Sequence, residues 1–171
     1  MIEFKYGSAE LSDETFVAEI ESCRFPNDQF RHADHIRLAW IYIRLCGYDV
    51  AERRMRTSIQ RFASNLGAAH KYHETITILW MQLVNIASHL STQLKTFDEF
   101  GYAHRWLFDK DSVFEFYSRE RLMSDIARKV WVEPDIKPIS ALQNLGESIN
   151  GRSPEEDVFY SQVSRGAPPE R

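Results

Sequence analysis

Apolar residues recur at helical spacing along most of this 171-residue chain, and no stretch alternates with the period of two that a half-buried strand requires. Within residues 49–66 they fall at spacings of four, three and four, at Met55, Ile59, Phe62 and Leu66. Residues 72–91 are apolar almost all round, which is typical of a helix enclosed by other helices. These features predict an all-α fold, a single-domain bundle of five to seven helices around a buried central helix.

Capping and breaking residues divide this pattern into segments. Ser12, Asp49 and Thr96 are candidate N-terminal caps, and Gly47 is a candidate C-terminal stop. The segment 132–138 contains two prolines and is expected to run extended over the surface. The expected helices cover residues 12–20, 30–46, 49–66, 72–91 and 97–108, with two short helices near 112–117 and 124–131.

The composition changes near residue 140. Only nine of the 32 residues in 140–171 are apolar, against 43% for the whole chain, and three of the seven glycines and three of the six prolines lie there. Such a segment buries too little apolar surface to offset the entropy lost on ordering. We therefore expect a helical bundle domain at 1–139 and a loosely docked or mobile tail with irregular structure at 140–171.

The charge balance argues against two classes of partner. Lys and Arg number 21 and Asp and Glu 25, the formal net charge is −4, and the basic residues form no long run. Such a chain lacks the positive surface that binds nucleic acid or anionic lipid. It also lacks the stretch of roughly 20 apolar residues that a membrane span needs. The sequence predicts neither a nucleic-acid partner nor a membrane partner.

Two observations predict a cytoplasmic location. Residues 1–10 do not combine a basic segment with a following apolar one, so they do not resemble a signal peptide. Cys23 and Cys46 are the only cysteines and form no C-x-x-C motif, so neither a disulfide framework nor a thiolate zinc site is indicated.

Four of the six histidines form two pairs at a spacing of three, His32 with His35 and His70 with His73. Residues three apart on a helix share one face, close enough for two imidazoles to reach one ion. Placing the starts of two helices side by side would bring His32, His35 and His73, with His70 or Glu74, around one point. We therefore expect His32, His35, His73 and His70 as ligands of a divalent metal (zinc, iron, nickel or manganese), and Glu74 as the catalytic base or a further ligand.

Aromatic and basic residues extend this predicted site. Thr77 and Trp80 continue the His73 face of the central helix, and Trp40 lies on the helix of the first histidine pair. The cluster around Arg119 and Arg121 offers cations for an anionic substrate group. The predicted substrate-binding residues are Trp40, Tyr72, Thr77, Trp80, Arg119 and Arg121.

Several known motifs are excluded by single residues. His73-Glu74 begins like the zincin motif H-E-x-x-H, but Thr77 stands where the second histidine belongs. Asp34 precedes His35, whereas His-Asp phosphohydrolases need the aspartate after the histidine. The chain contains no Glu-x-x-His pair of the di-iron bundles, no P-loop, no G-x-G-x-x-G and no G-x-S-x-G.

A longer pattern runs through these residues: Phe30-x-His32-x-x-His35-Ile36-Arg37-x-Ala39-Trp40-x-Tyr42, Lys71-Tyr72-His73-Glu74-Thr75-x-Thr77, Tyr117-Ser118-x-Glu120-Arg121-Leu122 and Val132-Glu133-Pro134-Asp135. It resembles a family of small bacterial helical proteins without an assigned activity, and the likeness spans about residues 16–138. The resemblance implies that these residues belong to one shared site, and it implies no particular reaction.

Three hypotheses on function follow. The first is a small metal-dependent enzyme acting on a small anionic substrate. The alternative is a non-catalytic bundle that binds a small ligand or a protein through an aromatic face, with structural histidines. The third is a metal-free enzyme in which His73 and Glu74 form an acid–base dyad. A homo-oligomer is compatible with each of them.

Overall fold

The computed structural model describes residues 6–142. Contacts divide the chain into two compact units, Met1–Ile139 and Ser140–Arg171. The predicted tail at 140–171 falls almost entirely outside the described residues.

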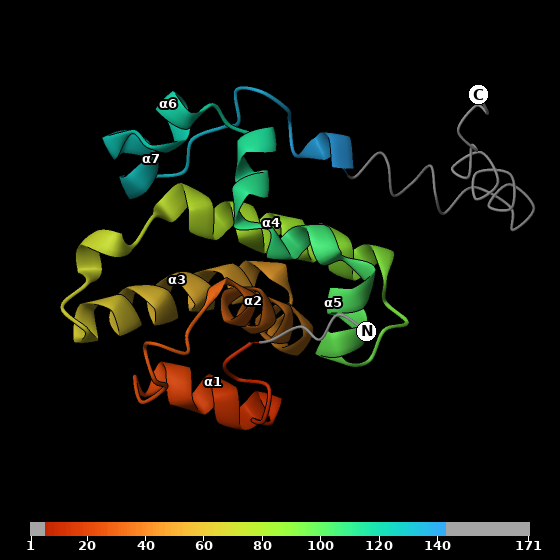
Figure 1. Ribbon diagram of the computed structural model, residues 1–171. Helices are drawn as coiled ribbons and strands as arrows, with labels where there is room; N and C mark the ends of the chain where they lie inside the picture. The colour runs from red at the N-terminus through yellow and green to blue at the C-terminus, as the bar shows by residue number, and fades with distance from the viewer. Residues whose placement is uncertain (1–5, 143–171) are drawn as a thin grey trace, which may run out of the picture. The chain divides into compact units, whose positions relative to one another are not determined.

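The all-α prediction is confirmed: residues 6–142 contain helices and no strand (Figure 1). None of these helices is long and apolar enough to cross a membrane. The α-helices are α1 (Asp13–Glu21), α2 (His32–Cys46), α3 (Tyr48–Asn65), α4 (Glu74–Leu90), α5 (Phe97–Ala103), α6 (Arg119–Leu122) and α7 (Asp125–Lys129). Three short 3-10 helices are η1 (Ala69–Lys71), η2 (Arg105–Phe108) and η3 (Lys110–Glu115).

Helix α4 occupies the centre of the fold. It contacts α2 and α3 on one side and α7 on another, while α1 packs against α3 on the side remote from α4 (Figure 1). Nine of its seventeen residues are buried, among them Leu79, Met81 and Leu83, which are fully enclosed. The apolar composition of this segment requires such enclosure on several sides.

The helix ends follow local capping chemistry. The Ser12 hydroxyl accepts a hydrogen bond from the backbone N–H of Thr15, and Thr96 begins α5 in the same way. The predicted cap at Asp49 is wrong, because α3 begins one residue earlier, at Tyr48. Gly47 ends α2 and starts α3 with φ 71°, a left-handed conformation that glycine adopts without strain and that permits the sharp reversal.

The region after α5 is more broken than expected. The predicted helix at 97–108 ends at Ala103 and continues as η2, the helix expected at 112–117 is η3, and α6 was not predicted. Short helices carry weak sequence signals, because their stability comes from tertiary packing rather than from local propensity. The segment 132–138 is free of helix, as its two prolines predict.

A buried carboxylate attaches the segment before α1 to α2. Asp34 is fully buried and accepts hydrogen bonds from the backbone N–H groups of Gly7 and Ser8 and from the Ser8 hydroxyl. Gly7 also packs against the backbone of Gln29, and only glycine fits there, since a Cβ would collide with the Gln29 carbonyl oxygen. Arg37, one turn further along α2, donates to the carbonyl oxygens of Ser8 and Leu11.

Candidate functional site

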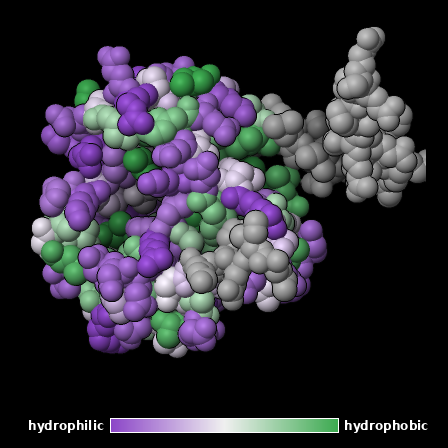
Figure 2. All heavy atoms as spheres, viewed as in Figure 1, coloured by the Kyte–Doolittle hydropathy of each residue, from purple (hydrophilic) through white to green (hydrophobic). Residues whose placement is uncertain are grey.

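A pocket of about 540 Å³ lies where the first turns of α2 and α4 meet α3, η3 and α6. We call it the histidine pocket, because His32, His35 and His73 line it. On the face shown in Figure 2, the surface is hollowed between the part that carries α6 and α7 and the part that carries α2 and α3. Seven of the residues predicted from the sequence line the pocket: His32, His35, Tyr72, His73, Thr77, Trp80 and Arg119. The other lining residues are Met55, Ile59, Lys71, Ile76, Lys110, Asp111, Val113, Phe114 and Met123.

His32 is the first residue of α2, and η2 fixes its orientation. Its Nε2 atom lies 2.8 Å from the carbonyl oxygen of Leu107, so Nε2 carries the proton and donates it. Its ring packs at 4.6 Å from the ring of Trp80. Burial lowers the pKa of His32, so the ring is neutral near pH 7 and its Nδ1 atom is an acceptor.

His35 lies one turn further along α2 and packs its ring against Phe30, with 4.1 Å between ring centroids. Among residues 6–142 it has no hydrogen-bond partner, and neither of its ring nitrogens is sealed from solvent. Burial, and to a lesser extent the neighbouring His32, lowers the pKa of His35 to about 4. At neutral pH it therefore offers the pocket one N–H donor and one nitrogen acceptor.

His73 lines the same pocket but has no free nitrogen. Its Nδ1 atom accepts a hydrogen bond from the backbone N–H of Ile76 and so caps α4, while its Nε2–H donates to the carbonyl oxygen of Leu122 at 2.9 Å. The predicted role of His73 as a metal ligand does not fit this arrangement. Binding an ion would break either the helix cap or the contact with α6.

The fourth predicted ligand, His70, lies apart from the other three histidines. His70 is exposed in η1, outside the pocket, and its carbonyl oxygen accepts a hydrogen bond from Arg128. In the part of the chain that the structure describes, no group of three or more His, Cys, Asp or Glu side chains is placed to hold a metal ion. The donor set therefore does not fit the divalent metal expected from the histidine spacing.

Glu74 takes part in an ion-pair network instead of facing the pocket. Its carboxylate accepts a hydrogen bond from the Tyr72 hydroxyl at 2.6 Å and lies 3.0 Å from the Nε atom of Arg56. Arg56 also pairs with Glu52, which accepts a hydrogen bond from Tyr48. Glu74 is thus held between a cation and a phenol, and it positions Tyr72 at the edge of the pocket. This arrangement gives no support to a dyad with His73.

Three cations line the pocket without an ion-pair partner among residues 6–142: Lys71, Lys110 and Arg119. The guanidinium of Arg119 lies 4.5 Å from the centre of the Phe114 ring, which restricts its orientation. Asp111 is the one carboxylate among the lining residues. The pocket thus carries an excess of positive charge in a chain whose net charge is −4.

Arg121, predicted to bind substrate, has a structural contact instead. Its Nε–H donates to the carbonyl oxygen of Glu133 at 2.6 Å. Nearby, the backbone N–H and hydroxyl of Ser118 both donate to the carboxylate of Asp135. These bonds hold the extended segment 132–138 against α6.

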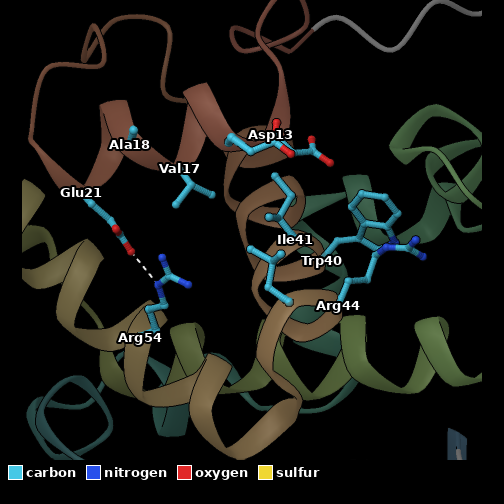
Figure 3. Close-up of a pocket in the computed structure, with 10 residues that line it drawn as sticks. Asp13, Val17, Ala18, Glu21, Trp40, Ile41, Arg44 and Arg54 are labelled. Atoms are coloured by element: carbon cyan, nitrogen blue, oxygen red, sulfur yellow. Dashed lines mark hydrogen bonds and ion pairs between the residues drawn. The ribbon is translucent and has the colours of Figure 1, made fainter.

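Trp40 lines a different cavity, of about 400 Å³, between α1, α2 and α3 (Figure 3). Three of the charged side chains there have partners: Glu21 pairs with Arg54 at 2.6 Å, and Arg44 lies 4.6 Å from the Trp40 ring. Because these charges already have partners, this cavity is a weaker candidate for a charged ligand than the histidine pocket.

Sequence reasoning missed two of the three cations in the histidine pocket. Lys71 stands in the quoted sequence pattern but is not among the predicted site residues, and Lys110 belongs to no predicted motif. No local spacing marks Lys110, because it reaches the pocket from η3, far from α2 and α4 in the sequence.

Comparison with protein-family models, with curated proteins and with solved structures finds no match for this chain. The family resemblance described above therefore stays a prediction.

Proposed function

We propose that this protein binds a small organic anion in the histidine pocket. The observation that carries the proposal is that Lys71, Lys110 and Arg119, which have no ion-pair partner in the described part of the chain, line one concave site of about 540 Å³. That volume is within the roughly 300–1,000 Å³ of typical small-molecule sites. Like charges that line one concave site repel one another, and a bound anion relieves this repulsion.

The apolar walls indicate what the rest of the ligand resembles. Trp80, Ile76 and Val113 line the pocket beside the cations. Flat or branched apolar bodies gain free energy by leaving water for such walls, while the charged groups fix their orientation. An aromatic carboxylate is the simplest molecule that combines the two features.

The metal-dependent enzyme predicted from the sequence loses its main support, because His73 and Glu74 already have partners within the protein. The expected small anionic ligand, by contrast, is supported by the charge of the pocket. We therefore favour ligand binding, the alternative hypothesis, over metal-assisted chemistry.

The test is a titration of the full chain with a panel of aromatic acids by ligand-observed NMR and calorimetry. Benzoate, phenylacetate and indole-3-acetate are the charged probes, and phenylacetamide is the uncharged match for phenylacetate. We expect saturable binding of at least one acid, weaker binding of the amide, and a loss of affinity with added salt.

Two variants locate the site. We expect Arg119→Gln and Lys110→Gln to weaken binding of that acid about five- to tenfold, because each removes a charge from the pocket. Arg53→Gln and Lys129→Gln remove exposed cations outside the pocket and should leave the affinity unchanged. Failure of every acid to bind, or equal binding of acid and amide, would overturn the proposal.

A further inference from the structure

Some polar side chains that line the histidine pocket already have hydrogen-bond partners within the protein, and others do not. The hydroxyl of Tyr72 donates to Glu74, and the hydroxyl of Thr77 donates to the carbonyl oxygen of His73. His73 itself uses both ring nitrogens. His32 and His35 remain as the pocket-lining imidazoles with a ring nitrogen that no hydrogen bond among residues 6–142 occupies.

These two imidazoles present a particular combination of donor and acceptor. The only N–H of the neutral His32 ring donates to the Leu107 carbonyl, so its other nitrogen, Nδ1, can only accept a hydrogen bond. His35 has no partner among the described residues and, when neutral, offers one N–H and one acceptor nitrogen. The two residues stand three apart on α2, where side chains begin about 5–6 Å from each other.

A hydroxyl group matches this combination, because its oxygen can donate one hydrogen bond and accept another. Two nitrogens that share one hydroxyl oxygen at ordinary hydrogen-bond distances of about 2.8 Å are themselves at most about 5.6 Å apart. An ammonium group lacks an acceptor for the N–H of His35, and a second carboxylate lacks a proton for His32. A hydroxyl is therefore the simplest group that satisfies both imidazoles.

We propose that the ligand of this pocket is a hydroxylated organic anion, whose charged group lies at the Lys71, Lys110 and Arg119 cations and whose hydroxyl binds between His32 and His35. This inference rests on the proposed function and specifies its substrate class. It assigns the two histidines a role in recognition rather than in holding a metal.

The first experiment compares matched probes on the unaltered full chain. Calorimetry measures phenylacetate, its 2-, 3- and 4-hydroxy isomers and the corresponding methoxy compounds. We expect at least one hydroxy isomer to bind about tenfold more tightly than phenylacetate, the gain from two hydrogen bonds to otherwise unmatched groups. The methoxy analogue of that isomer should lose the gain, because it cannot donate a proton to an imidazole.

The second experiment attributes the gain to the histidines. In His35→Phe and in His32→Gln, the ratio of hydroxyphenylacetate to phenylacetate affinity should fall toward one. His35→Asn provides a second, smaller replacement if the phenylalanine variant does not fold. His89→Phe alters an exposed histidine outside the pocket and should keep the ratio. In ¹⁵N spectra, the ring nitrogens of His35 should shift with the hydroxy isomer and not with its methoxy analogue.

The outcomes separate the two proposals. If phenylacetate and all its hydroxy isomers bind with equal affinity, and Arg119→Gln weakens the binding of each, the proposed anion site is supported and the proposed hydroxyl recognition is wrong. If a hydroxyl preference persists unchanged in both histidine variants, the assignment to His32 and His35 is also wrong. If none of the acids binds, the proposed function fails and this inference fails with it.

Discussion

The Nε2 atom of His73 lies 2.9 Å from the carbonyl oxygen of Leu122, a residue 49 positions further along the chain. The same ring caps α4 through Nδ1, so one imidazole joins the start of the central helix to α6. Arg119, which contributes a cation to the pocket, is the first residue of α6. His73 is therefore a positioning residue, holding that arginine beside the other lining groups.

Replacing His73 tests this role. We expect His73→Ala to lower the free energy of unfolding by about 2–4 kcal/mol, the sum of a lost helix cap and a buried carbonyl left without a donor. His73→Asn should lose roughly half as much, because asparagine caps a helix but is too short to reach Leu122. Urea unfolding measures both changes, and hydrogen exchange should report faster exchange in α6.

The matched control is His89→Ala, since that ring is exposed and bonds only to the carbonyl oxygen of Asn85 within its own helix. It should change the stability by less than about 0.5 kcal/mol. A loss of similar size in both alanine variants would contradict the positioning role.

The stability of the domain should fall as the pH drops, in part through His35. Burial lowers the pKa of this residue from 6.5 to about 4, so the unfolded chain binds a proton at a pH where the folded chain does not. The contribution of His35 to the free energy of unfolding is complete above pH 6.5 and is lost as the pH falls toward 4. It amounts to at most about 3 kcal/mol. Urea unfolding between pH 7 and pH 4.5 measures it.

His35→Phe removes the titrating group and should flatten that pH dependence relative to the unaltered chain. The pKa values of His32 and His73 are also lowered by burial, so a shallower dependence of the same sign should remain. Parallel pH profiles of the variant and the unaltered protein would show that His35 keeps its ordinary pKa.

Arg56 and Glu74 should be energetically coupled. In a double-mutant cycle with Arg56→Met and Glu74→Gln, we expect a coupling free energy of about 1 kcal/mol, since the pair lies 3.0 Å apart and is partly buried. Each single change leaves the other charge without this partner, whereas the double change removes both. Additive effects in urea unfolding would contradict the pairing.

Asp34 should be among the most sensitive positions of the domain. Its buried carboxylate accepts hydrogen bonds from two backbone N–H groups and a hydroxyl before α1, and from the N–H of Arg31. In Asp34→Asn one carboxylate oxygen becomes an NH₂ group that faces other donors, so we expect a loss of about 2–4 kcal/mol in unfolding free energy. Asp28→Asn, at an exposed position, is the control and should be nearly neutral.

Metal analysis directly tests the metal site predicted from the histidine spacing. We expect untagged protein to hold less than stoichiometric zinc, iron, nickel or manganese by mass spectrometry, and its thermal stability to be indifferent to added zinc. The physical reason is that His73 has no free nitrogen and His70 lies outside the pocket. One equivalent of metal that is lost in both His32→Ala and His35→Ala would restore the metal site predicted from the sequence.

Local chemistry in the sequence was enough to predict the long helices, though not the short α6. The apolar spacing from Met55 to Leu66 and the uniformly apolar segment 72–91 correspond to α3 and α4, and Ser12 and Thr96 cap the helices as expected. The spacing of His32 and His35 likewise predicted that both would face one site. Helical periodicity and capping depend on residues three or four positions apart, which a sequence displays directly.

Only the tertiary structure decided what those side chains do. The partners of His73, Arg121 and Glu74 are Leu122, Glu133 and Arg56, which lie between 12 and 49 positions away along the chain. The sequence shows that an imidazole, a guanidinium or a carboxylate is present, but a distant backbone carbonyl or an opposite charge determines whether that group stays free. In the folded domain His73, Glu74 and Arg121 bind other parts of the scaffold, whereas His32 and His35 share a pocket with three cations that have no ion-pair partner among residues 6–142.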